Sequence, residues 1–157
     1  MYTKILVPVD GSPTSTLGLA EAIKLAKLTG AQLKLIHAVD MMSVSLTPEV
    51  SMAATPTVFE LLRQGGQAIL TRAKAEADKS GISVETVLVE TLNGRVCDLV
   101  VDEAKQWGAE LIVIGTHGRR GVGRMLMGSD AEQILRSAPV PVLLVRQEKP
   151  PEAADHE

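Results

Sequence analysis

The segment from Gly115 to Ser129 has the composition of a phosphate-binding loop. It contains five glycines and three arginines and no acidic residue. An apolar run, 111–114, precedes it and a helical pattern follows it, so it lies between a predicted strand and a predicted helix. Glycines let backbone N–H groups approach a phosphate closely, and a helix start adds unpaired donors and the positive end of its dipole. These residues predict a polyphosphate site, with Arg119 and Arg124 as candidate phosphate partners.

Two widespread phosphate-binding signatures are absent from this segment. No glycine is followed by Lys-Ser or Lys-Thr, which excludes the G-x-x-x-x-G-K-[ST] loop. Gly121 and Gly123 begin a G-x-G-x-x-G pattern, but Leu126 stands where the third glycine belongs. Ser129 and Glu132 also fit a structural S-x-x-E capping box, in which the hydroxyl accepts a hydrogen bond from a first-turn amide. Capping and phosphate binding are compatible at one helix end, so both interpretations stay open.

A second polar cluster, from Asp10 to Pro13, follows the first apolar run of the chain. Ser12 is predicted to cap a helix whose first residue is Pro13. Asp10 then has two interpretations, because it either faces a ligand at the end of the strand or begins the turn before Ser12. His37 lies within a later apolar run and is expected to be a packed strand residue rather than a ligand.

The sequence favours binding over turnover. Phosphoryl transfer usually needs a carboxylate that holds a metal ion and a group that orients the attacking oxygen. Only Asp10 and Asp130 are candidates for the carboxylate, and nothing pairs His117 with a nucleophile or a second metal ligand. We therefore assign no catalytic residue.

Strands and helices alternate in the predicted secondary structure. The predicted strands are 5–9, 33–39, 84–89, 111–114 and 140–145, and the predicted helices are 13–29, 59–80, 96–107 and 130–137. This order predicts an α/β fold with an open parallel sheet and helices on both faces. Ligands of such sheets bind beyond the carboxyl ends of the strands, here the first and the fourth. Residues 41–56 form a long connection that is either mobile or a lid.

Composition limits the class of protein. A chain of 157 residues forms one domain and needs no disulfide or metal for stability. The single cysteine, Cys97, and the absence of an apolar N-terminal signal favour a cytoplasmic protein. Without a long apolar run, and with three aromatic residues, the chain is expected to bind neither membranes nor nucleic acid. Residues 147–157 hold four acids and one base, which accounts for the net charge of −3, and are predicted to be a disordered tail after a domain of residues 1–146.

The glycine spacing resembles a known motif. Gly115-x2-Gly118-x9-Gly128-Ser129 is similar to the G-2x-G-9x-G-(S/T) motif of the ATP-binding branch of the universal stress protein (UspA-like) family. The opening segment 4–12, the run 35–39, and the segments 131–135 and 139–145 resemble the same family. The resemblance extends over nearly all of residues 1–146.

This resemblance implies an adenine nucleotide lying across the carboxyl edge of a Rossmann-like, five-stranded sheet of order 3-2-1-4-5. It places Pro8, Val9 and Asp10 against the adenosine, Ala38 at the adenine edge, Ile114 and Gly115 on the floor, and Gly118, Gly128 and Ser129 at the phosphates. Asp130 departs from the family pattern, because many relatives carry valine there. A carboxylate suits a helix start, but it repels phosphate unless the arginines or a divalent cation intervene.

Three functional hypotheses follow. The first is an ATP-binding universal stress protein (ATP, ADP or AMP, with Mg²⁺) in which the nucleotide sets a regulatory state. The second is a slow ATPase or self-phosphorylating protein, and the third is an interaction module with a vestigial pocket. The apolar strand Val142-Leu143-Leu144-Val145 favours a homodimer, because exposed edges recruit partners and the family pairs this strand across a two-fold axis. Pro139 and Pro141 alternatively shield the edge of a monomer.

Overall fold

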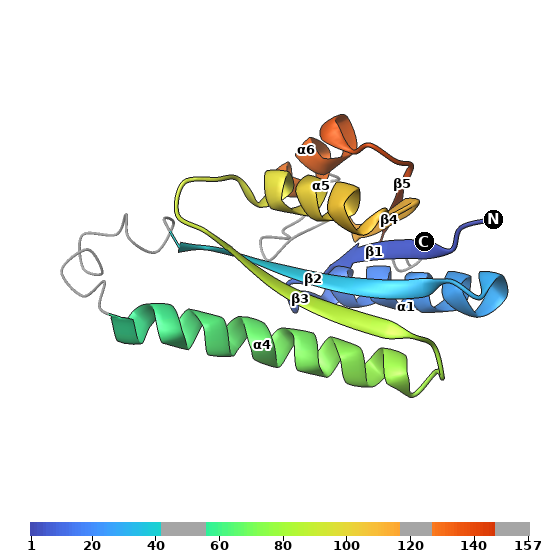
Figure 1. Cartoon of the computed structure of the whole chain (residues 1–157), viewed down its shortest axis with the longest axis horizontal. Helices are drawn as coiled ribbons and strands as arrows, with labels where there is room; N and C mark the ends of the chain where they lie inside the picture. The colour runs from blue at the N-terminus through green and yellow to red at the C-terminus, as the bar shows by residue number, and fades with distance from the viewer. Residues whose placement is uncertain (42–55, 117–126, 147–157) are drawn as a thin grey trace, which may run out of the picture.

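The structure, a computed structural model, describes residues 1–41, 56–116 and 127–146 (Figure 1). Strands and helices alternate along them. In chain order they are β1 (Lys4–Pro8), α1 (Pro13–Thr29), β2 (Gln32–Asp40), α4 (Pro56–Asp78), β3 (Val84–Thr91), α5 (Val96–Trp107), β4 (Leu111–Gly115), α6 (Ser129–Ser137) and β5 (Val142–Val145). Segment 41–56, apart from its ends, and tail 147–157 lie outside the described residues, so the predictions for them stay predictions.

The strands form one parallel sheet in the order β3-β2-β1-β4-β5. This order confirms the predicted fold class. β1 pairs with β2 on one side and with β4 on the other, so the winding direction reverses between β1 and β4. Helices α1 and α4 lie on one face of the sheet and α5 and α6 on the other (Figure 1).

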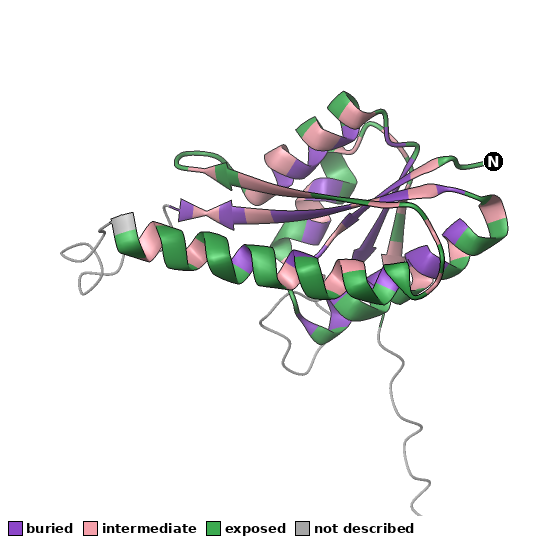
Figure 2. Cartoon of the chain, turned by 60° about the horizontal axis from the view of Figure 1, so that its bottom comes forward, coloured by how far each residue is buried: buried purple, intermediate pink, exposed green. Residues whose placement is uncertain are grey.

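Alternate residues of the central strands supply two apolar cores. Ile5 and Val7 of β1 join the cluster under α1 and α4, whereas Leu6 joins the cluster under α5 and α6. This alternation follows from the period of two in a strand, and both faces are apolar because helices cover both. Figure 2 shows the buried residues concentrated on the inner strands and on the sheet-facing sides of the helices.

The ends of α1 match the prediction. Ser12 is the N-cap, its side chain accepts a hydrogen bond from the Ser15 amide, and Pro13 is the first helical residue. Gly30 ends the helix in the left-handed conformation with φ of 73°, which glycine adopts without strain. Local sequence chemistry was therefore sufficient to define this helix.

The start of α6 differs from the prediction. The N-cap is Gly128, no side chain caps the helix, and Ser129 is its first residue. Glu132 accepts a hydrogen bond of 2.7 Å from Arg136, one turn later. The predicted capping box of Ser129 and Glu132 is therefore wrong, because the chain turns into the helix one residue earlier.

The start of β5 also differs from the prediction. β5 begins at Val142 rather than Val140, since Pro141 has no N–H for the ladder. In α5 the buried face is formed by Cys97, Val100, Val101 and Ala104.

Helix α4 is fastened to the sheet near the carboxyl edge. Arg63 donates two hydrogen bonds, of 2.6 and 3.1 Å, to the Glu90 carboxylate on β3. Gly66 lies so close to the sheet that a Cβ there would be 2.8 Å from His37 Cδ2 and from Leu88 Cδ1. The absence of a side chain at Gly66 thus allows α4 to approach β2 and β3. None of the helices in the described ranges is long and apolar enough to cross a membrane.

Candidate functional site

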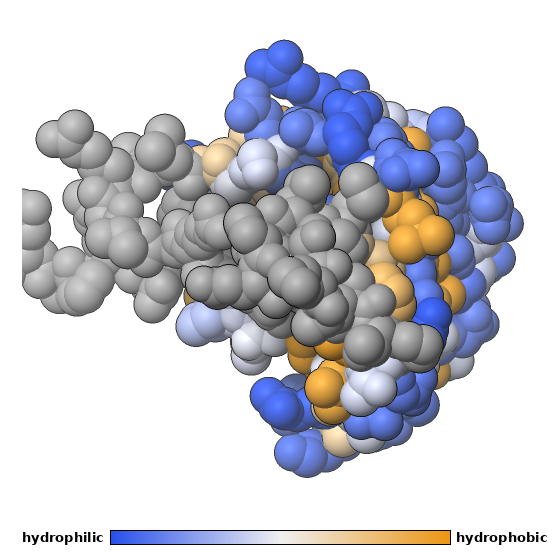
Figure 3. All heavy atoms as spheres, turned by 90° about the vertical axis from the view of Figure 1, so that its left-hand side faces the viewer, coloured by the Kyte–Doolittle hydropathy of each residue, from blue (hydrophilic) through white to orange (hydrophobic). Residues whose placement is uncertain are grey.

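A cavity of about 710 Å³ opens at the carboxyl edge of the sheet. Its lining residues come from the ends of β1, β2 and β4, from the starts of α1, α5 and α6, and from α4. Figure 3 looks onto this edge, where hydrophobic side chains gather among hydrophilic ones in the area that the grey atoms leave visible. The cavity lies at the strand ends where the winding reverses, which is the expected ligand position in such a sheet.

Nine residues predicted from the sequence line this one cavity. They are Pro8, Val9, Asp10, Ala38, Ile114, Gly115, Gly128, Ser129 and Asp130. Gly118, Arg119 and Arg124 lie outside the described residues. The structure thus brings together segments that are more than a hundred residues apart in the chain.

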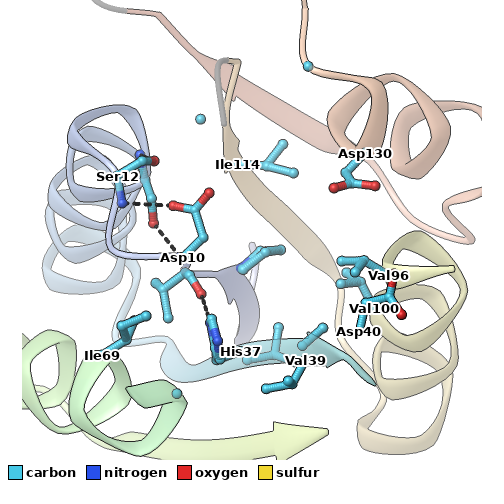
Figure 4. A pocket seen from close by; sticks show the side chains of 18 of the residues that line it. Asp10, Ser12, His37, Val39, Asp40, Ile69, Val96, Val100, Ile114 and Asp130 are labelled. Carbon is cyan, nitrogen blue, oxygen red and sulfur yellow. Dashed lines mark hydrogen bonds between the residues drawn. The ribbon is translucent and has the colours of Figure 1, made fainter. Parts of the chain in front are cut away.

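The turn after β1 is held by its own side chains. The Asp10 carboxylate accepts a hydrogen bond of 2.8 Å from the Ser12 amide. The Ser15 hydroxyl accepts a hydrogen bond of 3.1 Å from the Asp10 amide, and Gly11 has φ of 79°. Both sequence interpretations of Asp10 are therefore compatible with its position, because it begins the turn and also lines the cavity (Figure 4).

His37 connects β2 to the end of β1. Its Nδ1 lies 2.7 Å from the Val9 carbonyl oxygen, and the residue is 9% exposed. A carbonyl only accepts hydrogen bonds, so Nδ1 must carry a proton and donate. The predicted packing role fits this arrangement, although His37 also lines the cavity.

The first turn of α1 packs tightly against the end of β4. A Cβ at Gly115 would collide with the carbonyl oxygen of Thr14 and would lie 3.1 Å from the Ser15 nitrogen. A Cβ at Gly18 would meet the Gly115 nitrogen at 3.1 Å. Gly115 is therefore required by the approach of α1 to the strand, whatever the ligand.

Helix α6 begins at the cavity with its first amides uncapped. The Gly128 amide donates a 2.7 Å hydrogen bond to the Thr116 carbonyl, and the first helical bond runs from Glu132 N to Gly128 O at 3.0 Å. The amides of Ser129, Asp130 and Ala131 thus precede the first helical hydrogen bond, as in the first turn of any helix. They form a potential anion site, whereas the Gly128 amide is already used inside the protein.

Three carboxylates face the cavity from different elements: Asp10 after β1, Asp40 at the end of β2 and Asp130 on α6 (Figure 4). Burial raises the pKa of Asp130, and the negative charges of Asp10 and then Asp40 raise it further. The described lining residues include no lysine or arginine. In the same parts of the chain, no group of three or more potential ligands is placed to hold a metal ion.

Sequence reasoning missed several lining residues. Asp40 follows the apolar part of β2, so the rule that directed attention to Asp10 could also have identified it. The α4 wall gave no signal, because its sequence reads as an ordinary amphipathic helix. Its lining residues are Leu61, Leu62, Gly65, Gly66 and Ile69.

Comparison with known proteins identifies relatives along the whole fold. A sequence model of the Universal stress protein family matches residues 1–146. A universal stress protein of Methanocaldococcus jannaschii is 36% identical over 95% of this chain and 85% of its own length. A crystal structure from the universal stress protein family of Burkholderia pseudomallei is 33% identical, with a TM-score of 0.72, and covers 92% of this chain and 96% of that one.

Two more distant solved structures share the fold. One is a universal stress protein in complex with cAMP, 24% identical with a TM-score of 0.64, covering 94% of this chain and 98% of that one. The other is the universal stress protein from Archaeoglobus fulgidus in complex with dAMP, also 24% identical with a TM-score of 0.64, covering 91% and 97%. Fold, sequence identity and the match over residues 1–146 agree, and the chain belongs to the universal stress protein family.

Proposed function

We propose that this protein binds an adenine nucleotide in the cavity at the carboxyl edge and acts as a nucleotide-dependent regulator in a stress response. The observation that carries the proposal is the position of the cavity, between β1 and β4 and at the uncapped start of α6. Apolar walls and a row of free amide donors at one end suit a ligand with a flat base and a phosphate.

The adenine would lie between the ends of β1, β2 and β4. Val9 and Ile114 supply apolar surface there. The Ile36 carbonyl accepts a hydrogen bond of 2.9 Å from the Val9 amide. Backbone groups two residues apart on a strand face the same neighbouring strand, so the backbone groups of Ala38 point to the same side as those of Ile36. Because β1 has ended at that level, they face open space, where an adenine edge could reach them.

The phosphates would lie at the start of α6. The amides of Ser129, Asp130 and Ala131 provide donors, and the Ser129 side chain is exposed next to them. Asp10, across the cavity, is placed to accept a hydrogen bond from a ribose hydroxyl. Relatives of the same fold with bound cAMP and dAMP support an adenosine monophosphate unit as the minimum ligand.

Binding is proposed without efficient turnover. A Mg²⁺ ion accompanying a triphosphate would be coordinated mainly by phosphate oxygens and water, as is usual for this ion in nucleotide sites. Steady phosphate release above a protein-free blank, lost in Asp10→Ala, would instead identify a slow ATPase. The buried thiol of Cys97 fits action in the reducing cytoplasm.

The second part of the proposal is a homodimer through β5. This strand lies at the edge of the sheet, and Leu143 within it is 36% exposed. An apolar edge with unpaired backbone groups is suited to pairing with a second copy. Light scattering at micromolar concentration is expected to give the mass of a dimer, and a monomer mass would contradict this part alone.

The nucleotide proposal is tested by calorimetry with adenosine, AMP and ATP on the full chain and on Ala38→Phe. The phenyl ring would occupy the adenine position, so affinity is expected to fall at least roughly tenfold. Ala75→Phe, on the exposed side of α4, is the matched control and should bind like the parent. Absence of binding by the parent protein at high concentration would contradict the proposal and favour an interaction module.

A further inference from the structure

The carboxylates of the cavity differ in their hydrogen bonds to the rest of the protein. Asp10 accepts a hydrogen bond from the Ser12 amide, whereas no hydrogen bond or ion pair joins Asp130 to another residue in the described ranges. Figure 4 shows the Asp130 carboxylate on the α6 side of the cavity, across from Asp10, with Asp40 on the neighbouring wall. Asp130 is thus a negative charge that projects into the space left for the ligand.

The surroundings of Asp130 oppose its charge. A carboxylate in the first turn of a helix is normally stabilised by the dipole, which lowers its pKa. Here the pKa is raised instead, first by loss of water and then by Asp10 and Asp40. On the α5 side, Asp130 in turn contributes to raising the pKa of the Cys97 thiol. His37 also lines the cavity, but its Nδ1 is hydrogen-bonded to the Val9 carbonyl oxygen and not to Asp130. Among the described residues, the ionisable side chains that act on the pKa of Asp130 are therefore both acidic, next to the uncapped amides of α6.

The charge of Asp130 acts unequally on the parts of a nucleotide. Adenine and ribose are neutral, so their contacts with Val9, Ala38 and Ile114 do not depend on it. A phosphate near the amides of α6 carries its charge beside the Asp130 carboxylate, and the repulsion grows with each further phosphate charge. Asp130 is exposed, so water and salt screen part of this repulsion, and its effect on binding is largest at low ionic strength.

We propose that Asp130 is a specificity-determining residue of this cavity, which makes the site favour adenine nucleotides of low phosphate charge over uncomplexed triphosphates. The inference rests on the proposed function, because it assumes that the ligand of the cavity is an adenine nucleotide. It assigns to Asp130 a role that differs from that of the amide donors next to it: the amides attract a phosphate, and the carboxylate limits how much charge is accepted.

The test measures the ratio of ATP to adenosine affinity in the presence of EDTA. Asp130→Asn keeps the shape and removes the charge, and Asp130→Ala is a second neutral variant. Both are expected to raise the affinity for ATP at least roughly tenfold, to raise that for AMP less, and to leave that for adenosine within about twofold. Asp102→Asn, on the exposed side of α5 and outside the cavity lining, removes the same charge elsewhere and should leave the ratio unchanged. All four proteins keep the arginines of segment 117–126, so the comparison isolates Asp130.

The possible failures are distinct. Binding of nucleotides with the same ratio in the parent, both Asp130 variants and Asp102→Asn would overturn the role of Asp130 and leave the nucleotide proposal intact. Equal gains for ATP and adenosine in the Asp130 variants would also overturn it, because they would indicate a change of pocket shape. Absence of any binding by all the proteins would contradict the proposed function, and this inference with it.

Discussion

Helices α1 and α6 both begin at this cavity, and their first turns are built differently. At α1, the Ser12 side chain accepts a hydrogen bond from the Ser15 amide, and Asp10 in turn accepts one from the Ser12 amide. At α6, the cap is Gly128, and no side chain in the described part of the chain accepts a hydrogen bond from the first amides. The first-turn amides of α1 have acceptors within the protein and so stabilise the fold. Those of α6 lack such acceptors among the described residues beside the cavity, so they are available to a ligand.

Gly115→Ala should have the largest effect, which is a loss of stability at the contact between α1 and β4. The new Cβ would collide with the Thr14 carbonyl, so the first turn of α1 must move away from β4. We expect a loss of about 2–3 kcal/mol in the free energy of unfolding, as for an overpacked core site. Chemical denaturation measures it. Gly65→Ala is the control, because nothing lies within 4 Å of a Cβ there and alanine favours the helix by about 1 kcal/mol. Equal stability of the two variants would contradict the tight α1 to β4 contact.

Removing each serine hydroxyl should separate the two helix starts. Ser12→Ala loses the cap of α1 and is expected to cost about 1–2 kcal/mol of stability. Ser129→Ala removes no capping hydrogen bond, so the unfolding free energy should change by less than about 0.5 kcal/mol. The same pair, measured for nucleotide affinity, should show the larger loss for Ser129. A similar destabilisation by both would show that α6 is capped after all.

The carboxylates in the first turns of α6 and α5 should respond to pH with opposite signs. The pKa of Asp130 in the folded state lies above its ordinary value of 3.8. Between these two pKa values the folded state binds more protons than the unfolded state, so the free energy of unfolding falls as pH rises through this range. Asp130→Asn should therefore gain up to about 1 kcal/mol at neutral pH, a small gain for a partly exposed group, and should match the parent below the ordinary value. In α5, Arg95 holds the pKa of Asp98 below its usual value through a hydrogen bond.

Asp98→Asn, in the first turn of α5, is the variant to compare with Asp130→Asn when stability is measured against pH. Its charge contributes stability that is present above the ordinary carboxyl pKa and is lost as pH falls through the lowered one. The variant should thus be less stable than the parent at neutral pH and equal to it in strong acid. Unfolding followed from neutral to acid pH compares the two, and the same sign for both variants would contradict the electrostatic difference between these first turns.

The smallest expected effect is on amide hydrogen exchange. Saturation with AMP should slow the exchange of the amides of Ser129, Asp130 and Ala131, because a phosphate would accept from them. The Ser15 and Thr16 amides already donate to Ser12 and should change little. NMR-detected exchange with and without AMP compares the two sets, and adenosine, which has no phosphate, is the control ligand. Equal slowing at both helices would show that the ligand stabilises the whole edge instead.

The sequence predicted most of the fold because its signals are local. Ser12 with Pro13 and the glycine at position 30 defined α1 through capping chemistry, and the apolar runs defined a parallel sheet. The start of α6 was mispredicted, because the pattern of Ser129 and Glu132 does not reveal that the amide of Gly128 is bonded to Thr116. That hydrogen bond joins two distant segments, and spacing along one helix carries no information about it.

The candidate site was predictable in part for the same reason. Residues at strand ends, such as Asp10 and Ile114, follow from the geometry of parallel sheets. The wall formed by α4 depends on how closely Gly66 approaches His37, which only the packed structure reveals. The raised pKa of Asp130 likewise comes first from burial and then from Asp10 and Asp40, which lie far from it in the chain and near it in space.

The hydrogen bond from the Gly128 amide to the Thr116 carbonyl, 2.7 Å long, closes the base of the segment between these residues. A segment anchored at both ends can change in length at low cost, since doubling a loop adds only about 0.6 kcal/mol of closure entropy. The scaffold is therefore suited to loop grafting: a reporter peptide or a longer recognition sequence inserted between Thr116 and Gly128 should leave the register of β4 and the start of α6 unaltered. In natural variants, the same anchorage would let selection alter ligand preference through this segment while the sheet stays unchanged.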